Sequence, residues 1–396
     1  MRFYASVRGI LSLKVLIIAC RYYPAKNSGG PVISIDNLCS LLNHKVEFNV
    51  LAFDHDVGSD EVFKDIDIGW NKHDNCSVYY LPKKDVNTKN FSSLIADLRP
   101  DLLYVNSLFS AKFVVSALKS ARDHGLPVLL APRGQLCANA FKKKAKKFAY
   151  LTLYRRLFSK NNVYYQYTST EERNAILHYL PAKPERVLGL PNIPNTRVTP
   201  PKKAEKLQGK LKIAFISRIH SKKNLLGAIR FLHEVSGDVD FNIYGPLEEE
   251  SYWVKCQDEI SKLPRNISVA HLGTLNYDEV FNIFASHDVF LFPTFSENYG
   301  HVIAESLLSG CPVLISDQTP WSGVTDEGAG WVYSLDNEQG FISTLNHLVE
   351  MDASEYRSIS SKCRNYVLGQ LNLEEIADSY ISSFEMLKIE GTKTNA

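Results

Sequence analysis

The chain has 396 residues, of which 45% are hydrophobic and 22% charged, and it contains 21 Gly and 17 Pro. This length and composition exclude a disordered chain and predict two folded α/β cores. With 45 basic and 43 acidic residues the formal net charge is only +2. The electrostatic field of the whole chain therefore does not favour binding of nucleic acid, and we expect no nucleic-acid partner.

The first apolar segment runs from Val15 to Cys20 behind a basic N-terminal stretch, and its last four residues resemble a lipoprotein cleavage box. Lys14 shortens the segment below the roughly 7–15 apolar residues of a signal peptide, so we expect a buried strand of a parallel sheet. The seven cysteines are scattered without a CxxC pair, which favours a reducing compartment and disfavours zinc. No run approaches the ~18 apolar residues of a membrane span, and we expect a cytoplasmic protein.

Strand-like and helix-like segments alternate along the chain. The strand candidates VEFNVLAF, SVYYLP, DLLYVNS, PVLLAPRG and VYYQYTS precede the Pro- and Lys-rich stretch LGLPNIPNTRVTPPKKAEK, and KIAFISRI, FNIYGP, SVAHLGT, DVFLFPT, PVLISD and GWVYS follow it. We predict an α/β protein with two Rossmann-like domains, 1–195 and 196–372, whose parallel sheets face a central cleft. Residues 373–396 add an apolar helix, which we expect to pack back on the N-terminal domain, and a polar tail.

The stretch FLFPTFSENYGHVIAESLLSGCPVLIS predicts a strand, a loop, a helix and a second strand. A helix that begins near Gly300 or His301 directs unpaired backbone N–H groups at a ligand above the sheet, which favours a diphosphate. Glu297 lies in the loop and Glu305 about one turn inside the helix. Because carboxylates repel phosphate, we expect Glu305 to accept hydrogen bonds from a ribose and Glu297 from a transferred hexose.

Cations for the diphosphate are predicted in FISRIHSKKNL, where Arg218 ends a strand and Lys223 begins a helix. Together they would stabilise the charge on a departing nucleoside diphosphate. Gly245, directly after the strand FNIY, is assigned to the donor-binding side as well. We expect no cofactor and no metal, because these cations and the helix N-terminus do the neutralising that Mg²⁺ does elsewhere.

These motifs resemble the family-4 retaining glycosyltransferases of the GT-B fold, and the resemblance covers most of the chain. The Glu-x7-Glu signature of that family matches Glu297 and Glu305, and its Arg-x4-Lys pair matches Arg218 and Lys223, with Ser217 in place of the usual Gly. The resemblance implies transfer of a hexosyl unit, with retention, from a nucleoside-diphosphate sugar to a hydroxyl of a glycan or lipid-linked oligosaccharide in surface polysaccharide biosynthesis. It also implies that the backbone amides facing sugar and phosphate belong to Asn298, Tyr299, Gly300 and His301.

The acceptor side is predicted in the first half. The turn RYYPAKNSGGP is similar to the Gly-Gly loop of the family at Gly29 and Gly30, although a plain loop turn is the alternative. No GxGxxG fingerprint is present, which disfavours a dehydrogenase. Where the family often has a His, this chain has Asn106 and Ser107, and Arg133 in APRGQL resembles the PRG segment of a polysaccharide-building branch, which implies contact with an acceptor phosphate.

The segment 141–162 carries eight Lys or Arg residues and no acid, interleaved with aromatic and aliphatic residues at helical spacing. One interpretation is a helix on an anionic membrane surface, where it would meet a lipid-linked acceptor. The other is a solvated helix packed on its own domain. Both stay open at the level of sequence.

Two other classes of function also stay open. A nucleotide-sugar epimerase or hydrolase of the same fold would consume donor without an acceptor. A non-catalytic sugar-nucleotide-binding protein would bind donor and never release the nucleoside diphosphate.

Overall fold

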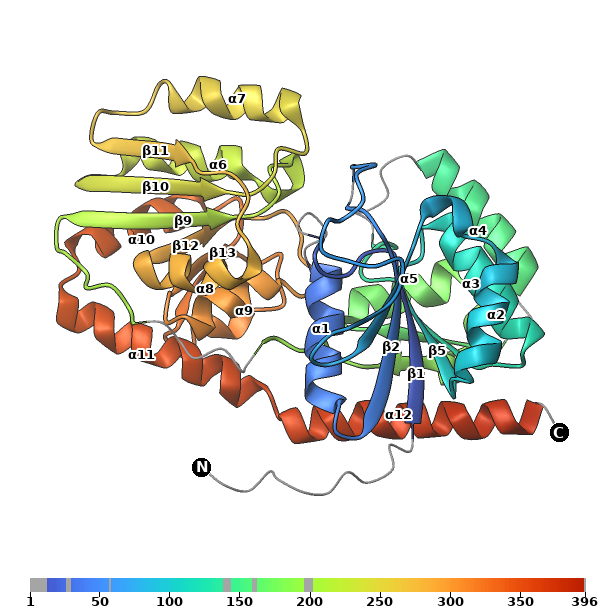
Figure 1. Cartoon of the computed structure of the whole chain (residues 1–396). Coiled ribbons are helices and arrows are strands. Elements are labelled where there is room, and N and C mark those ends of the chain that lie inside the picture. The colour runs from blue at the N-terminus through green and yellow to red at the C-terminus, as the bar shows by residue number, and fades with distance from the viewer. Residues whose placement is uncertain are drawn as a thin grey trace. The chain divides into compact units, whose positions relative to one another are not determined.

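The computed structural model describes residues 13–25, 30–56, 58–137, 144–158, 162–195 and 202–394. The chain forms two compact units (Figure 1): an N-terminal unit of Met1–Ile193 with Leu373–Ala396, and a C-terminal unit of Pro194–Asn372. Each unit is built on one mainly parallel sheet, so the predicted α/β class with two Rossmann-like sheets is confirmed. The last helix of the chain belongs to the N-terminal unit.

The described part of the N-terminal unit contains an eight-stranded sheet in the order β3-β4-β2-β1-β5-β6-β7-β8. Its strands are β1 (Leu13–Ala19), β2 (Val46–Phe53), β3 (Gly69–Lys72), β4 (Ser77–Leu81), β5 (Leu102–Asn106), β6 (Val128–Ala131), β7 (Val163–Tyr167) and β8 (Val187–Gly189). Only β3 runs antiparallel to its described neighbour. The strand order reverses direction at β1 and β5, which pair in parallel, so the carboxyl ends of these two strands mark the switch point of the sheet.

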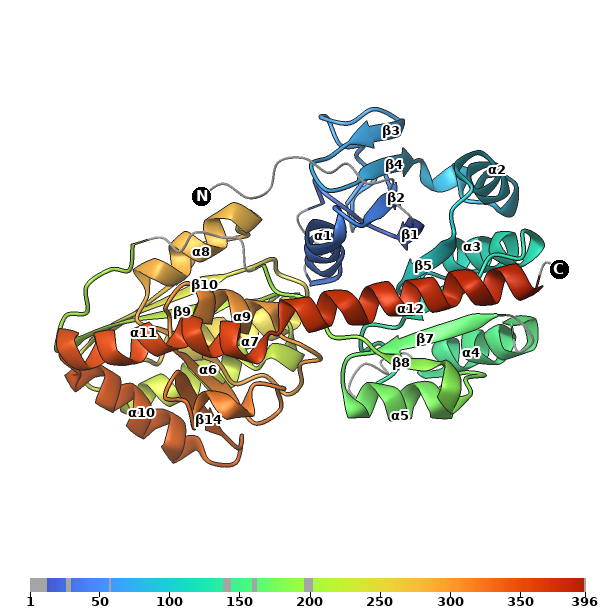
Figure 2. The same cartoon turned by 90° about the horizontal axis from the view of Figure 1, so that it is seen from below.

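Helices cover both faces of this sheet. They are α1 (Gly30–Leu42), α2 (Thr88–Leu98), α3 (Ala111–Asp123), α4 (Lys144–Phe158), α5 (Thr170–Tyr179) and α12 (Leu373–Thr394). Leu103 and Val105 of β5 belong to the core formed with α2, α3, α4 and α5. Tyr104 between them points to the opposite face, where its ring lies 6.4 Å from Phe384 of α12. Figure 2 shows α12 running along this unit over its whole length.

Tyr380 fixes α12 to the sheet through a buried polar contact. Its hydroxyl donates to Pro191 O at 2.9 Å and accepts from Gln166 Nε2 of β7 at 2.9 Å. Gln166 also donates to Leu190 O at 2.8 Å. The segment where the chain leaves the unit and the helix where it returns are therefore held by the same side chains.

The C-terminal unit contains a parallel sheet in the order β11-β10-β9-β12-β13-β14. Its strands are β9 (Lys210–Ile216), β10 (Asp238–Tyr244), β11 (Ile267–His271), β12 (Val289–Phe292), β13 (Val313–Ser316) and β14 (Gly330–Tyr333). The central strands β12 and β13 are continuous apolar runs, apart from the final Ser316, because both faces of the sheet are buried there. The order reverses between β9 and β12, which places the switch point of this sheet at their carboxyl ends.

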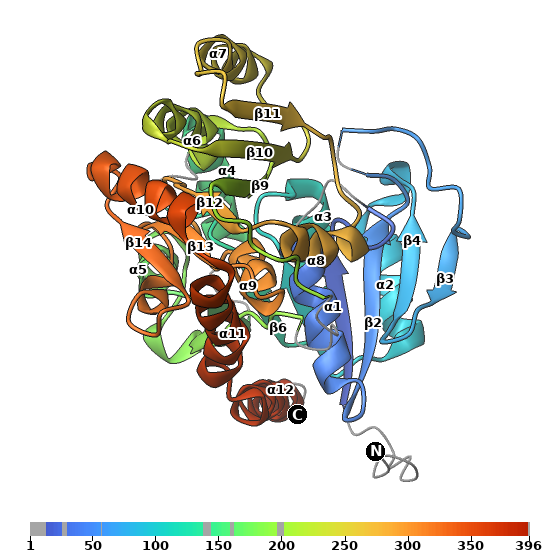
Figure 3. The ribbon, with the colours of Figure 1, turned by 90° about the vertical axis from the view of Figure 1, so that its left-hand side faces the viewer.

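The helices of the C-terminal unit form two layers around its sheet (Figure 3). They are α6 (Leu225–Phe231), α7 (Glu250–Ile260), α8 (Tyr277–Ser286), α9 (His301–Leu308), α10 (Glu338–Glu350) and α11 (Ala353–Gln370). Helix α6 contacts α7 and α10, whereas α9 contacts α8 and α11. Within the described ranges, no helix combines the length and the apolar composition that crossing a bilayer requires.

Candidate functional site

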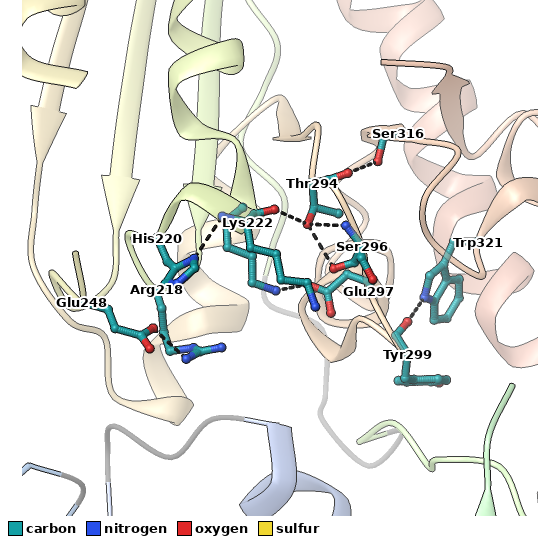
Figure 4. A network of polar contacts seen from close by, with 11 residues as sticks. Arg218, His220, Lys222, Glu248, Thr294, Ser296, Glu297, Tyr299, Ser316 and Trp321 are labelled. Atoms are coloured by element: carbon teal, nitrogen blue, oxygen red, sulfur yellow. Dashed lines mark hydrogen bonds and ion pairs between the residues drawn. The ribbon is translucent and has the colours of Figure 1, made fainter. Parts of the chain in front are cut away.

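Two loops meet at the switch point of the C-terminal sheet. One follows β9 and carries Arg218 and Lys223, and the other follows β12 and leads into α9. Backbone and side-chain bonds join them, since Phe295 N donates to Lys222 O at 3.0 Å and Thr294 Oγ1 donates to the same oxygen at 3.2 Å. The loops therefore form one surface at the edge where open α/β sheets bind ligands (Figure 4).

Helix α9 begins at His301, as the sequence pattern predicts, with Gly300 as its N-cap. Gly300 has φ +79°, and a Cβ there would lie 2.9 Å from Ile303 Cδ1, so this turn requires glycine. Trp321 Nε1 donates to Tyr299 O and fixes the residue before the cap (Figure 4). The first turn of α9 contains no acidic residue, so its N–H groups carry an uncompensated positive polarity that suits an anion.

Glu297 and Lys223 form an ion pair across the two loops, with side chains only 15% and 13% exposed. The backbone N–H of Glu297 donates to Gln318 O at 3.0 Å, which orients the residue within its loop. Lys223 Nζ also lies 5.4 Å from the centre of the Phe292 ring. The predicted cation and the predicted sugar-binding acid are therefore direct neighbours.

Arg218 lies near the same surface and pairs with Glu248 of the loop after β10. Its Nη1 lies 2.6 Å from Glu248 Oε2, and both side chains are largely exposed (Figure 4). Gly245 explains how this loop approaches, because it has φ +133° and a Cβ there would lie 1.9 Å from Ser217 O. The structure thus gives Gly245 a steric reason to be glycine: it lets the loop after β10 lie against the residue before Arg218.

Glu305 lies on α9 with only 4% of its surface exposed. Its Oε1 has no hydrogen-bond partner among the residues that the structure describes, and burial raises the pKa of its carboxyl group to about 8. The hydroxyl of Tyr299 is likewise buried without a described partner, and burial, together with the charge of Glu305, raises its pKa. Buried polar atoms of this kind normally have partners, so these two oxygens are suited to hydroxyl groups of a ligand.

Asn298 and His301 complete the predicted donor segment. Asn298 is partly buried in the loop, and the His301 ring lies 4.8 Å from the ring of Tyr299. All donor-side residues that the sequence predicts, including Gly300 and Gly245, thus lie in the loops and helix at this end of one sheet.

Sequence reasoning did not single out four residues that shape this site. They are Glu248, Thr294, Ser316 and Trp321. Ser316 Oγ donates to Thr294 O at 2.5 Å, so the end of β13 supports the loop after β12. The strand order β10-β9-β12-β13 brings these residues together, and only a correct order of strands would have revealed them.

The acceptor-side predictions fall at the switch point of the N-terminal sheet. Gly30 is the first residue of α1, while Gly29 lies outside the described residues. Asn106 ends β5 and is buried, with its Nδ2 donating to Pro31 O at 3.2 Å. Its Oδ1 accepts from Arg133 Nε at 2.5 Å, so these two predicted residues touch.

Arg133 makes two further bonds, to Asn192 Oδ1 and to the Tyr104 hydroxyl at 2.7 Å. All three acceptors of its guanidinium are neutral oxygen atoms. Ser107 has φ +152° and begins the loop after β5, where Gln135 Oε1 accepts from the backbone N–H of Leu108 at 2.9 Å. Gln135 was not predicted, although it lies in the same PRGQ stretch as Arg133.

The basic segment 141–162 is described only in part, since residues 141–143 and 159–161 lie outside the described ranges. Its helix α4 buries Leu151 and Tyr154 against the N-terminal core. On the outer side of the helix Leu153 is 49% exposed, near the exposed Lys146 and Arg156, whereas the 46% exposed Phe148 lies toward α5, with its ring 6.1 Å from that of Tyr179. The helix therefore packs on its own unit and also presents an apolar and basic outer face.

Among the residues that the structure describes, no group of three or more His, Cys, Asp or Glu side chains is arranged to hold a metal ion.

Residues 199–366 match the family model described as Glycosyl transferases group 1. The C-terminal unit therefore matches a group 1 glycosyltransferase over most of its length. The matched range includes Arg218, Lys223, Glu297 and Glu305, and the match confirms the expected enzyme class, a glycosyltransferase. A comparison with curated protein sequences finds no match.

Solved structures of glycosyltransferases share the fold of the whole chain. Alr3699/HepE from Anabaena, in complex with UDP and glucose, has a TM-score of 0.72 at 15% identity and covers 94% of this chain and 100% of its own. Sucrose-phosphate synthase from Thermosynechococcus elongatus has a TM-score of 0.72 at 14% identity, with 95% of this chain and 99% of its own covered. WaaG, a glycosyltransferase involved in lipopolysaccharide biosynthesis, has a TM-score of 0.61 at 13% identity over 94% of this chain and 99% of its own. At these identities the likeness establishes the GT-B fold of the glycosyltransferase.

Proposed function

We propose that this glycosyltransferase moves a hexosyl unit from a nucleoside-diphosphate sugar to a hydroxyl of a glycan or lipid-linked oligosaccharide, with retention of the anomeric configuration. The proposal places the enzyme in surface polysaccharide biosynthesis, on the cytoplasmic side of the membrane. The observation that carries it is the meeting of Lys223, Glu297 and the N-terminus of α9 at one switch point. A similar fold binds UDP in the Anabaena protein, which agrees with a nucleotide-sugar donor.

The donor diphosphate would lie against the first turn of α9, where the backbone N–H groups of Gly300 and His301 face an anion. Arg218 and Lys223 add positive charge from the loop after β9. Glu305 and the Tyr299 hydroxyl, both buried with an unpartnered oxygen among the described residues, would bond to the ribose.

The chemical step uses the ion pair between Lys223 and Glu297. When the diphosphate binds to the Lys223 ammonium in place of Glu297, the Glu297 carboxylate becomes available to accept a hydrogen bond from the hexose. The bond from the anomeric carbon to the phosphate oxygen then breaks, the acceptor oxygen bonds to the anomeric carbon, and the acceptor proton passes to the leaving diphosphate, whose remaining charge the cations stabilise. In this scheme no metal is required, because Arg218, Lys223 and the helix N-terminus supply the positive charge.

The acceptor side is proposed in the N-terminal unit. Arg133 donates from all three guanidinium nitrogens to neutral oxygens, so its net charge remains available to an acceptor phosphate. Asn106 would position that guanidinium through its 2.5 Å bond. Gly30, at the start of α1, lets the chain approach the acceptor closely.

We further propose that the outer face of α4 touches an anionic membrane. Leu153 would enter the interface while exposed Lys146 and Arg156 meet acidic headgroups, each basic residue contributing about 1 kcal/mol. A variant with Lys146→Ser, Leu153→Ser and Arg156→Ser should lose co-sedimentation with vesicles of acidic phospholipid. Unchanged co-sedimentation would contradict this contact.

The decisive test of the main proposal begins with a thermal-shift panel of UDP, GDP and ADP sugars, because a ligand that binds only the folded state raises its stability. Release of nucleoside diphosphate is then measured with and without lipid-linked oligosaccharide. Release that requires acceptor supports transfer. Equal consumption without acceptor would favour an epimerase or hydrolase, and binding without release would favour a non-catalytic sugar-nucleotide-binding protein.

A further inference from the structure

The exposed side chain of Arg218 forms an ion pair with an acidic residue of the same unit. Its Nη1 lies 2.6 Å from Glu248 Oε2, with the two side chains 53% and 42% exposed. Such a solvent-exposed pair contributes little to stability, about 0–1 kcal/mol. The pair therefore needs an explanation other than stability.

The backbone holds Glu248 in this place. Leu247 forms a parallel bridge with Ile219, the residue after Arg218, and Glu248 N donates to Ile219 O at 3.2 Å. Gly245 allows the approach, since a larger residue would collide with Ser217 O. The carboxylate of Glu248 is thus presented to Arg218 by the loop after β10, and a flexible encounter between two long side chains is not required.

The neighbouring charges do not substitute for Glu248. The Glu249 carboxylate accepts a hydrogen bond from the backbone N–H of Ser221 at 3.1 Å, and Lys223 pairs with Glu297. Among the ion pairs between described residues, Glu248 is the acid that pairs with Arg218.

We propose that Glu248 competes with the diphosphate for Arg218 and thereby promotes release of the nucleoside diphosphate product. The inference rests on the proposed function, because it assigns Arg218 to a diphosphate. A diphosphate makes stronger, multiply charged contacts with a guanidinium than one carboxylate does, so it displaces Glu248 on binding. The displaced carboxylate stays nearby, repels the bound anion, and recaptures Arg218 as the product leaves.

The competition acts more strongly on product than on donor. Free nucleoside diphosphate ionises at its terminal phosphate and carries more negative charge than the sugar ester, so Glu248 repels the product more. Glu248 is therefore a residue that sets product inhibition without touching the sugar.

The experiment uses Glu248→Gln, which keeps the size of the side chain and removes its charge. Calorimetry with UDP as the probe, and with GDP and ADP in parallel, should show binding tightened by about threefold to fivefold, with an equally lowered inhibition constant of the product. Glu250→Gln is the matched control, because Glu250 is exposed two residues along the same chain segment and removes the same charge. It should change the affinity by less than about twofold. In an Arg218→Met background, Glu248→Gln should give less than half of its effect on binding.

Unchanged or weaker UDP binding by Glu248→Gln, or an equal gain in Glu250→Gln, would overturn this role of Glu248 while leaving the proposed function intact. An undiminished gain in the Arg218→Met background would also overturn it. If the wild-type protein bound none of UDP, GDP and ADP, the proposed function itself would fail, and this inference with it.

Discussion

Glu305→Gln tests the charge state of the buried carboxyl group on α9. Burial raises its pKa from 4.5 to about 8, so the folded protein keeps this proton over a pH range in which the unfolded chain has lost it. The folded state therefore gains stability from Glu305 below pH 4.5, and this gain is lost progressively as the pH rises through about 8.

The magnitude follows from the size of the shift. Each pKa unit corresponds to about 1.4 kcal/mol, so the loss between pH 4.5 and 8 is on the order of 4–5 kcal/mol for this fully buried group. Glutamine does not titrate, so the free energy of unfolding of Glu305→Gln relative to wild type should rise by up to about 1.4 kcal/mol per pH unit over that range. The buried amide of the Glu305→Gln variant lacks good hydrogen-bond partners, which costs about 1–3 kcal/mol at every pH. This constant cost shifts the curve of unfolding free energy against pH without changing its slope.

Urea unfolding between pH 5 and pH 9 measures this difference. Trp253, Trp321 and Trp331 lie in the C-terminal unit, so tryptophan fluorescence reports mainly on the unit that contains Glu305. Glu250→Gln serves as the control, because the exposed Glu250 should show no such slope. Parallel curves for wild type and Glu305→Gln would refute the raised pKa of this buried carboxyl group.

Three further changes test the site. Glu297→Ala should abolish turnover and change the dissociation constant of UDP by only a few-fold, as calorimetry would show; equal losses of binding in Glu297→Ala and Glu305→Ala would contradict the separate roles of the two acids. Lys223→Met should weaken the binding of UDP by about 10- to 100-fold, because a charge-assisted hydrogen bond contributes about 1.5–3 kcal/mol, and it should leave the binding of uridine unchanged. A similar loss of uridine binding would show general damage to the site. Gly300→Ala should lower the free energy of unfolding by about 1–3 kcal/mol, given its φ of +79° and the contact of the new Cβ with Ile303; an unchanged urea midpoint would show that the turn tolerates a side chain.

The sequence pattern predicts the secondary structure around the donor site well. Glu297 lies in a loop, α9 begins at His301 and Glu305 lies inside the helix, as expected from the apolar runs and the position of Gly300. These features depend on local spacing and on glycine, which a single sequence displays directly.

The ion pairs could not be predicted in the same way. Lys223 was assigned to the diphosphate, but its pairing with Glu297 depends on β9 and β12 being adjacent, although they are separated by two intervening strands in the sequence. The contact of Arg218 with Glu248 depends on the path of the loop after β10. Strand order and loop path are set by tertiary packing, and periodicity alone does not contain them.

The contacts of Tyr380 bear on how the chain folds during synthesis. During synthesis the N-terminal unit lacks α12, which covers Tyr104 and bonds to Gln166, until the segment from Leu373 has been translated. The C-terminal unit is contiguous in sequence and is free to fold before that moment. The N-terminal unit is thus completed after the C-terminal unit, and a fragment that ends before Leu373 leaves Tyr104 and Gln166 without the helix that covers them.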